Sequence, residues 1–201
     1  RDIFVTDGAV KNASDRGYAK QTIGARIAPT IGKDGKDTVR KRPGWKYLKS
    51  VNLGRPIVNA DVLINFSHVK GHGDCGFGGA CKNLGMGCVP WETRQKIHAL
   101  EGDLTWSKAK CIRCNRCIDE CEMGANKFNE DGDYEIFWHH CKMCLHCMLA
   151  CPTGAIRIKD PKFDRFQDAL AHVANLVLNT FKPGRRFHIN VLTNITLFCD
   201  C

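Results

Sequence analysis

The sequence lacks the features that two classes of protein require. It has no run of about 18 consecutive apolar residues, so no transmembrane helix is expected. It also lacks a basic motif interleaved with aromatic residues, as well as a recognition helix, so nucleic acid is not an expected partner. Residues 197–201 read as the interior of a structure, and we therefore expect the chain to be a fragment of a longer protein.

Cysteine, by contrast, is abundant, with 13 among 201 residues. Eight of them lie in two blocks that share the spacing C-x2-C-x2-C-x3-C. The first block is Cys111, Cys114, Cys117 and Cys121, and the second is Cys141, Cys144, Cys147 and Cys151, which Pro152 follows. This is the ligand pattern of proteins that carry two [4Fe–4S] clusters. Iron–sulfur ligation predicts a reducing, cytoplasmic and anaerobic setting, whereas disulfides would need an oxidising one.

The two blocks resemble those of bacterial two-cluster ferredoxins, and the resemblance implies how the clusters are bound. In such ferredoxins the fourth cysteine of each block ligates the other cluster. Three closely spaced cysteines wrap one face of a cube, and the fourth points away to the neighbouring cluster. Cluster one is thus expected to use Cys111, Cys114, Cys117 and Cys151, and cluster two Cys141, Cys144, Cys147 and Cys121. Zinc is the alternative metal, but four-cysteine zinc sites usually use two separated C-x2-C pairs.

Charge is concentrated near the N-terminus. The formal net charge is +9, and much of the excess lies in one basic stretch. This stretch contains Lys33, Lys36, Arg40, Lys41, Arg42, Lys46 and Lys49. A run of this kind predicts a docking face for an acidic redox partner or a larger enzyme complex, with a solvated loop as the alternative.

Hydrophobic patterning predicts an α/β core interrupted by the cysteine-rich module. Short strands are expected at residues 3–5, 62–66 and 187–192, a short helix at 92–100 and an amphipathic helix at 164–181. A hairpin is expected at residues 127–137. The predicted fold class is an α/β core with an inserted α+β two-[4Fe–4S] ferredoxin-like module. Its predicted parts are the N-terminal part of the α/β domain at 1–106, the module at 107–160 and the return to the α/β domain at 161–201.

A glycine-dense segment at residues 71–87 is expected to form a loop. Residues 71–76 spell the G-x-G-x-x-G of dinucleotide-binding proteins, but a helix must open there, and the glycines that follow argue against it. Glycine lets backbone approach a ligand closely. His72 offers acid/base chemistry near neutral pH, and Lys82 offers charge for a phosphate or carboxylate, so both are candidate catalytic residues. A tight structural loop with a satisfied histidine is the alternative.

Two family resemblances rest on this segment. Residues 68–88, the cysteine-rich module and the final F-C-D-C resemble the domain of unknown function 362 family, whose chains continue beyond that motif. The segment is also similar to the H-x3-G-[YF]-x-G-x2-K loop of nickel-pincer lactate racemases, although Cys81 precedes the lysine and Met86 replaces a proline. The second resemblance implies an acid/base role for His72, a cofactor or substrate anchor at Lys82 and a nickel ligand at His98.

Five cysteines fall outside the two blocks: Cys75, Cys81, Cys88, Cys199 and Cys201. Soft ligands of this kind could build a third metal site. The residues expected to contribute are His98, Cys88, Cys199 and Cys201, and the alternative is that several of these cysteines are small buried hydrophobic residues.

Two functions are consistent with these features. The first is an iron–sulfur redox protein, an oxidoreductase, in which the two clusters pass electrons to a site beside His72 and Lys82. The second is an electron-transfer subunit of a larger redox complex without an active site of its own. The first is favoured because the chain is much longer than a two-cluster carrier requires.

Overall fold

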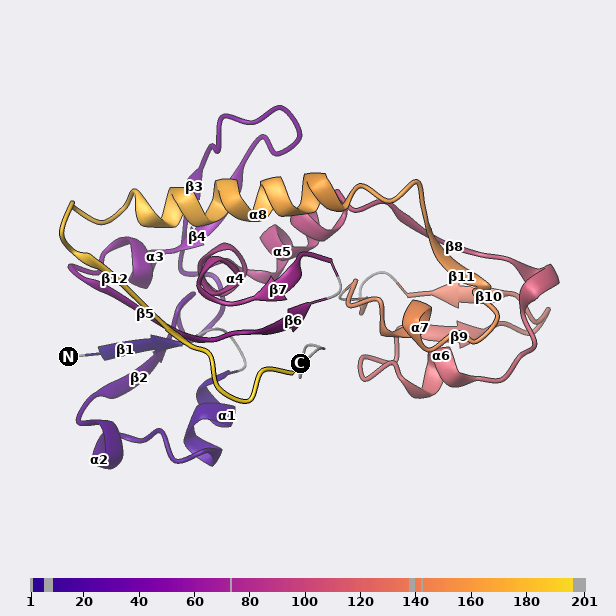
Figure 1. The fold of residues 1–201 in the computed structure, drawn as a ribbon, viewed down its shortest axis with the longest axis horizontal. Helices are drawn as coiled ribbons and strands as arrows, with labels where there is room; N and C mark the ends of the chain where they lie inside the picture. Colours follow the sequence, from indigo (N-terminus) through magenta and orange to yellow (C-terminus); the bar gives the residue numbers. More distant parts are fainter. Residues whose placement is uncertain (1, 6–8, 73, 138–139, 142, 197–201) are drawn as a thin grey trace. The chain divides into compact units, whose positions relative to one another are not determined.

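The computed structural model describes residues 2–5, 9–72, 74–137, 140–141 and 143–196. Cys199 and Cys201, predicted as metal ligands, lie outside the described residues. The fold is mixed α/β, as the sequence predicts at that coarse level (Figure 1). The chain divides into two compact units, one formed by residues 1–97 and 163–201 and the other by residues 98–162.

The first unit is built around a parallel pair of strands. β5 (Leu63–His68) and β12 (Arg186–Val191) pair in register, with Phe187 opposite Ile64. Two helices accompany the pair: α4 (Ala80–Gly85) contacts β5 and β12 and packs against the long helix α8 (Phe163–Leu178). The strands and the amphipathic helix predicted in these regions are confirmed, with ends that differ by a few residues. The apolar face of α8 is buried because Phe166, Val173 and Val177 recur at helical spacing.

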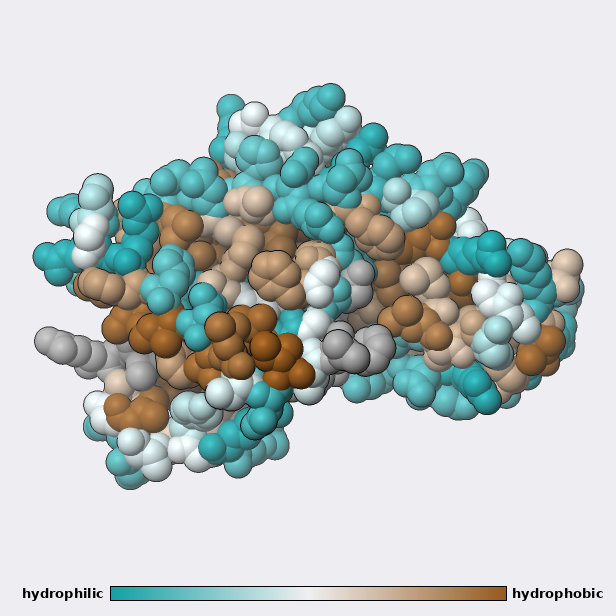
Figure 2. Space-filling view, in the orientation of Figure 1, coloured by the Kyte–Doolittle hydropathy of each residue, from teal (hydrophilic) through white to brown (hydrophobic). Residues whose placement is uncertain are grey.

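The two faces of this strand pair differ in polarity. The side chains of Asn65 and Ser67 are buried, and the Asn65 side-chain amide donates to the Ala80 carbonyl at the start of α4. The opposite face exposes Ile64, Phe66, Phe187 and Ile189, and Figure 2 shows apolar side chains gathered over this part of the unit. Parallel strands usually have both faces covered. In this pair, by contrast, the described residues leave one apolar face exposed.

The N-terminal elements form small sheets and short helices. β1 (Asp2–Val5), the first predicted strand, pairs in parallel with β2 (Arg26–Pro29), and β3 (Thr38–Lys41) pairs antiparallel with β4 (Val51–Gly54). The helices are α1 (Ala9–Asp15), α2 (Lys20–Ile23) and α3 (Arg55–Val58). Val51 and Leu53 are buried on β4, whereas much of the basic stretch around β3 is exposed.

The glycine-dense segment is not a continuous loop, so that expectation is wrong. β6 (Lys70–His72) and β7 (Gly76–Gly78) form an antiparallel hairpin, and α4 follows. Strand β5 is therefore followed by another strand rather than by the helix that a dinucleotide site requires. The helix forms in spite of Gly85, and this glycine allows close packing: a Cβ at this position would lie 2.7 Å from the Leu170 carbonyl oxygen of α8. Helix α5 (Trp91–His98) then ends the first half of the unit, close to the predicted 92–100 helix.

In its described residues, the second unit contains two short antiparallel sheets and two single-turn helices. β8 (Asp103–Trp106) pairs with β11 (Ile156–Lys159), and β9 (Asn126–Phe128) pairs with β10 (Tyr134–Ile136), which confirms the predicted hairpin. The helices are α6 (Arg116–Asp119) and α7 (His146–Leu149), and a 3₁₀ turn covers Lys108–Lys110. Across the described part of the chain, no helix combines the length and apolar character that crossing a membrane requires.

Candidate functional site

The repeat of the two cysteine blocks is also a repeat of backbone conformation. Arg113 and Asn115 have φ of 53° and 61°, and Met143 and Leu145, thirty residues later in each case, have φ of 51° and 63°. Non-glycine residues in this region cost about 1–3 kcal/mol each, so such positions persist only where the surrounding structure demands them. Turns of this kind form concavities of backbone N–H groups that bind anions, including iron–sulfur clusters.

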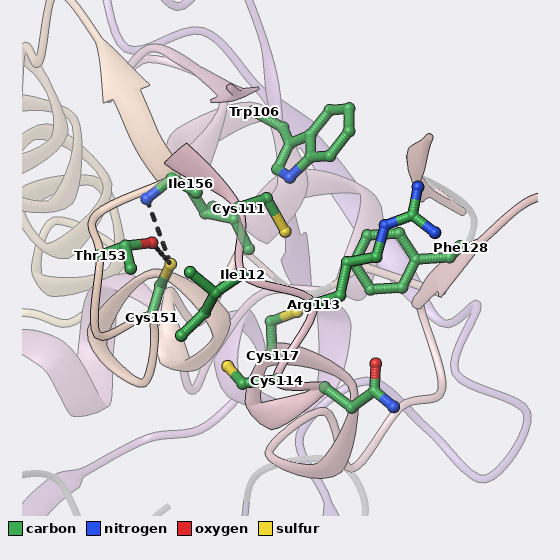
Figure 3. A pocket seen from close by; sticks show the side chains of 12 residues that line it. Trp106, Cys111, Ile112, Arg113, Cys114, Cys117, Phe128, Cys151, Thr153 and Ile156 are labelled. Carbon is green, nitrogen blue, oxygen red and sulfur yellow. Dashed lines mark hydrogen bonds between the residues drawn. The ribbon is translucent and has the colours of Figure 1, made fainter. Parts of the chain in front are cut away.

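Four cysteines from the two blocks line one pocket in the second unit. They are the first three of block one and the last of block two, namely Cys111, Cys114, Cys117 and Cys151. Figure 3 shows these four sulfur-bearing side chains around one space, with Cys151 reaching it from the turn after α7. Trp106, Phe128 and Ile156 close the pocket with apolar surface. A set of four thiol donors in a largely apolar pocket suits a thiolate-bound cluster.

The remaining four block cysteines also influence one another electrostatically. Burial raises the pKa of the Cys141 thiol, and the neighbouring Cys144 and Cys121 add to that rise. Burial likewise raises the pKa of Cys147, and Cys141 and Cys144 act on it in the same direction. Cys121 of block one therefore lies within electrostatic range of Cys141 of block two.

The fourth cysteine of each block receives an equivalent backbone hydrogen bond. The Ala155 amide donates to the Cys151 sulfur at 3.2 Å, and the Ala125 amide donates to the Cys121 sulfur at 3.3 Å. Burial acts to raise the pKa of Cys151, but hydrogen bonds from the backbone of Ile156 and from Thr153 outweigh it and lower the pKa. These donors favour a thiolate over a thiol. By contrast, burial raises the pKa of Cys117 to about 11.

Three aromatic rings pack together beside the cysteines. The ring centroids of Trp106 and Tyr134 are 6.2 Å apart, and Phe128 lies 6.3 Å from the first and 5.7 Å from the second. The ring of Tyr134 packs in this cluster, whereas its hydroxyl is buried near cysteine sulfur, and burial is the largest cause of its raised pKa.

His72 and Lys82, the predicted catalytic pair, both lie near Asp74 in the first unit. The backbone N–H of Asp74 donates to Nδ1 of His72 at 3.2 Å, and an Asp74 carboxylate oxygen lies 3.7 Å from the same nitrogen. The His72 ring is nearly parallel to that of Phe166 on α8, with centroids 6.4 Å apart. Burial lowers the pKa of the Lys82 ammonium, Lys70 lowers it further, and Cys75 and Asp74 oppose the shift.

Asp74 was not among the residues that the sequence indicated. Its side chain is 8% exposed, and the Gln167 side chain of α8 donates to its backbone carbonyl at 3.0 Å. The only local signal was its position two residues after His72, and that spacing carries no meaning until the β6–β7 hairpin is known.

The two described residues that were predicted for a third metal site, Cys88 and His98, belong to different units. Cys88 is buried in the first unit, where burial raises its pKa to about 12, and its thiol lies 3.7 Å from the Asn83 carbonyl oxygen. His98 belongs to the second unit, and its Nδ1 lies 2.8 Å from the buried carboxylate of Glu101. The contribution of these residues to metal binding stays a prediction.

Comparison with known proteins identifies relatives at the level of the whole chain and of a shorter segment. The model of the family described as "Domain of unknown function (DUF362)" matches residues 2–201. An uncharacterised ferredoxin of Methanocaldococcus jannaschii is 36% identical over 55 residues, which are 26% of this chain and 71% of the ferredoxin.

Two further relatives match over segments of similar length. Pyruvate synthase subunit PorD of Methanocaldococcus jannaschii is 39% identical over 54 residues, or 26% of this chain and 63% of PorD. An iron–sulfur protein of Rhodospirillum rubrum is 32% identical over 73 residues, or 35% of this chain and 37% of that protein. The chain thus spans less than two thirds of either relative. Similarity to a ferredoxin and to an iron–sulfur protein agrees with the cysteine pattern.

Proposed function

This chain belongs to the family described as Domain of unknown function (DUF362), and on that premise we propose that it is an iron–sulfur redox protein with two [4Fe–4S] clusters. Cluster one is held by Cys111, Cys114, Cys117 and Cys151, and cluster two by Cys141, Cys144, Cys147 and Cys121. The module at residues 107–160 is a ferredoxin-like insertion in an α/β domain formed by residues 1–106 and 161–201. A reducing, anaerobic cytoplasm is the proposed setting.

The observation that carries this proposal is the pocket in which Cys151 joins three cysteines of the other block. A pair of independent zinc sites, each made from one block, would have no need of that exchange. The equivalent amide hydrogen bonds to Cys121 and Cys151 support a matching arrangement for cluster two. The 55-residue match to a ferredoxin has the length that such a module requires.

When bound, the clusters supply one-electron transfer at potentials set by their surroundings. The protein's own part in this chemistry is to bind and shield them. Backbone N–H groups of Ala125 and Ala155 stabilise thiolate sulfur, and Trp106, Phe128 and Ile156 exclude water from the pocket around cluster one.

The proposed destination of the electrons is a site at His72, Asp74 and Lys82. Nδ1 of His72 accepts the Asp74 amide, so the neutral ring carries its proton on Nε2, from which it can be donated. If Nδ1 becomes protonated, the Asp74 carboxylate 3.7 Å away stabilises the imidazolium. Lys82, with its lowered pKa, can hold an anionic group or take part in proton transfer.

A second candidate function follows from the basic N-terminal stretch. In that reading the chain is an electron-transfer subunit, and the exposed cations around β3 dock an acidic partner or a larger complex. Arg40, Lys46 and Lys49 carry this charge in the first unit. The name of one relative, pyruvate synthase subunit PorD, describes a subunit of a larger enzyme.

Metal and sulfide analysis of anaerobically purified protein tests the proposal. Two clusters require about eight iron atoms per chain together with the broad visible absorption of iron–sulfur centres. Zinc without that absorption would contradict both candidate functions.

The same analysis separates the two functions. About eight irons and no other metal favour the carrier. Additional iron or nickel that is lost in His72→Ala/Lys82→Ala favours an enzyme, and nickel would indicate a pincer-type cofactor at His72 and Lys82. Lys96→Ala, at an exposed position of α5, is the control and should keep the wild-type metal content.

A further inference from the structure

Two buried hydrogen-bond donors of the second unit lack a hydrogen bond of ordinary geometry among the described residues, although the sulfur of Cys147 lies within reach of one of them, the Tyr134 hydroxyl. They are the indole nitrogen of Trp106 and the hydroxyl of Tyr134. Buried donors are almost always paired in native proteins, because an unpaired donor loses its bonds to water without replacement. Two such donors in neighbouring side chains call for a stronger acceptor than the sulfur of a neutral thiol.

Trp106 places its donor at the pocket of cluster one. It is the last residue of β8, paired with Ile156 of β11, and it lines the pocket together with Cys111 and Cys151. Figure 3 shows the edge of the ring that bears the nitrogen turned toward the Cys111 sulfur. The N–H therefore faces the space that the four cysteines surround.

Tyr134 places its donor near the second set of cysteines. It lies on β10, opposite Phe128 of β9, and its ring packs against Trp106. Its hydroxyl interacts most strongly with Cys147 and more weakly with Cys117 and Cys121. Cys147 and Cys121 are both ligands proposed for cluster two.

Sulfur atoms of a bound cluster are the acceptors that would satisfy both hydrogen-bond donors. Each cluster presents sulfides and thiolate sulfurs with negative charge, and hydrogen bonds to these sulfurs are among the factors that set its potential. We propose that Trp106 donates its indole N–H to a sulfur of cluster one and that Tyr134 donates its hydroxyl to a sulfur of cluster two. The two side chains thereby tune the two potentials separately. This inference rests on the proposed function, because it requires both clusters.

The direction of the tuning follows from charge. One-electron reduction adds negative charge to the cluster, and its sulfurs then accept hydrogen bonds more strongly. Both hydrogens stay on their side chains, and the added electron comes from an external reductant. Each bond therefore stabilises the reduced form more than the oxidised form, so each donor raises the potential of its own cluster.

Potentiometric titration of the reconstituted full chain, followed by electron paramagnetic resonance, tests the proposal. Tyr134→Phe removes only the hydroxyl, and Trp106→Phe removes the N–H. Each variant should weaken reduction of one cluster by up to about tenfold, which for one electron is about 59 mV. The double variant should lower both potentials. Thr105→Ala is the control, because Thr105 precedes Trp106 on β8 but is exposed and does not line the pocket.

Several results would overturn the inference and leave the proposed function intact. These are two clusters with unchanged potentials in both variants, two variants that shift the same cluster, or a shift in Thr105→Ala equal to that in Trp106→Phe. Wild-type protein without iron would instead contradict the proposed function itself, so the two failures are distinguishable.

A second measurement covers the case in which Trp106→Phe does not assemble its clusters. Protein labelled with ¹⁵N at the indole nitrogens is reduced, and hyperfine coupling of ¹⁵N to the cluster spin is measured. The label should couple, and the coupling should persist in Trp138→Phe, which leaves Trp106 as the one tryptophan in residues 98–162. Absence of coupling, or its loss in Trp138→Phe, would overturn the role of Trp106.

Discussion

The close approach of α4 to α8 makes the glycine-rich segment sensitive to a single methyl group. In Gly85→Ala, the new Cβ would lie 2.5 Å from Cδ1 of Leu170 and 2.7 Å from the Leu170 carbonyl oxygen. Ordinary carbon contacts need about 3.5–4.0 Å, so the Leu170 side chain must move by about 1 Å. The carbonyl belongs to the backbone of α8 and moves only if the two helices separate.

The magnitude of this effect is a balance of two terms. Overpacking of a buried contact costs about 1–3 kcal/mol, and a clash with backbone belongs to the upper part of that range. Replacing glycine by alanine within a helix stabilises the helix by about 1 kcal/mol. We therefore expect Gly85→Ala to lower the free energy of unfolding by about 1–2 kcal/mol, measured by urea unfolding followed by circular dichroism.

A double-mutant cycle with Leu170→Ala identifies the cause. Leu170→Ala alone opens a cavity, because Leu170 is buried, and should cost about 2–5 kcal/mol. In the Gly85→Ala background, Leu170→Ala also relieves the clash with Cδ1. The double variant should therefore lose about 1 kcal/mol less unfolding free energy than the sum of the two single losses. Additive effects, or a Gly85→Ala variant as stable as the wild type, would refute the argument from packing.

Further predictions concern charge and metal content. Asp74→Asn should lower the pKa of Lys82 further, because the Asp74 carboxylate favours the charged ammonium. Lys70→Met should raise that pKa, because the Lys70 charge disfavours the ammonium. Nuclear magnetic resonance of methylated lysines measures both shifts. Since the folded pKa of Lys82 is below its ordinary 10.5, stability should rise with pH between the folded value and 10.5, and Lys82→Met should remove that rise in urea unfolding at several pH values. His98→Ala leaves the buried Glu101 carboxylate without its 2.8 Å contact and should cost about 1–3 kcal/mol, part of which Glu101→Gln restores. Cys121→Ala should reduce the iron content to about four atoms, whereas unchanged iron content would exclude Cys121 as a ligand.

The sequence predicted those elements whose signal is local. The strands β1, β5 and β12, the helix α8 and the β9–β10 hairpin follow from apolar periodicity and turn residues. The short elements between residues 9 and 60 carried no such pattern. The helix α4 was missed because glycine opposes a helix locally, whereas its packing against Leu170 depends on a residue 85 positions after Gly85.

The candidate site was predictable to the extent that ligand spacing is a local property. The cysteine blocks indicated a cofactor, but the positive φ at Arg113, Met143 and Leu145 has no signal in those residue types. The proximity of Asp74 to His72 and Lys82 depends on the β6–β7 hairpin. The role of the donors on Trp106 and Tyr134 depends on their burial, which aromatic identity alone does not indicate.

The exchange of Cys121 and Cys151 between the blocks is the central claim, and iron content in paired cysteine variants tests it most directly. Cys111→Ala/Cys151→Ala removes two ligands of the same proposed cluster and should keep about four irons. Cys141→Ala/Cys151→Ala removes one ligand from each cluster and should keep almost none. Cys81→Ala, an exposed cysteine outside both blocks, should keep about eight. The reverse order of the two paired variants would show that each block binds its own metal and would contradict the account.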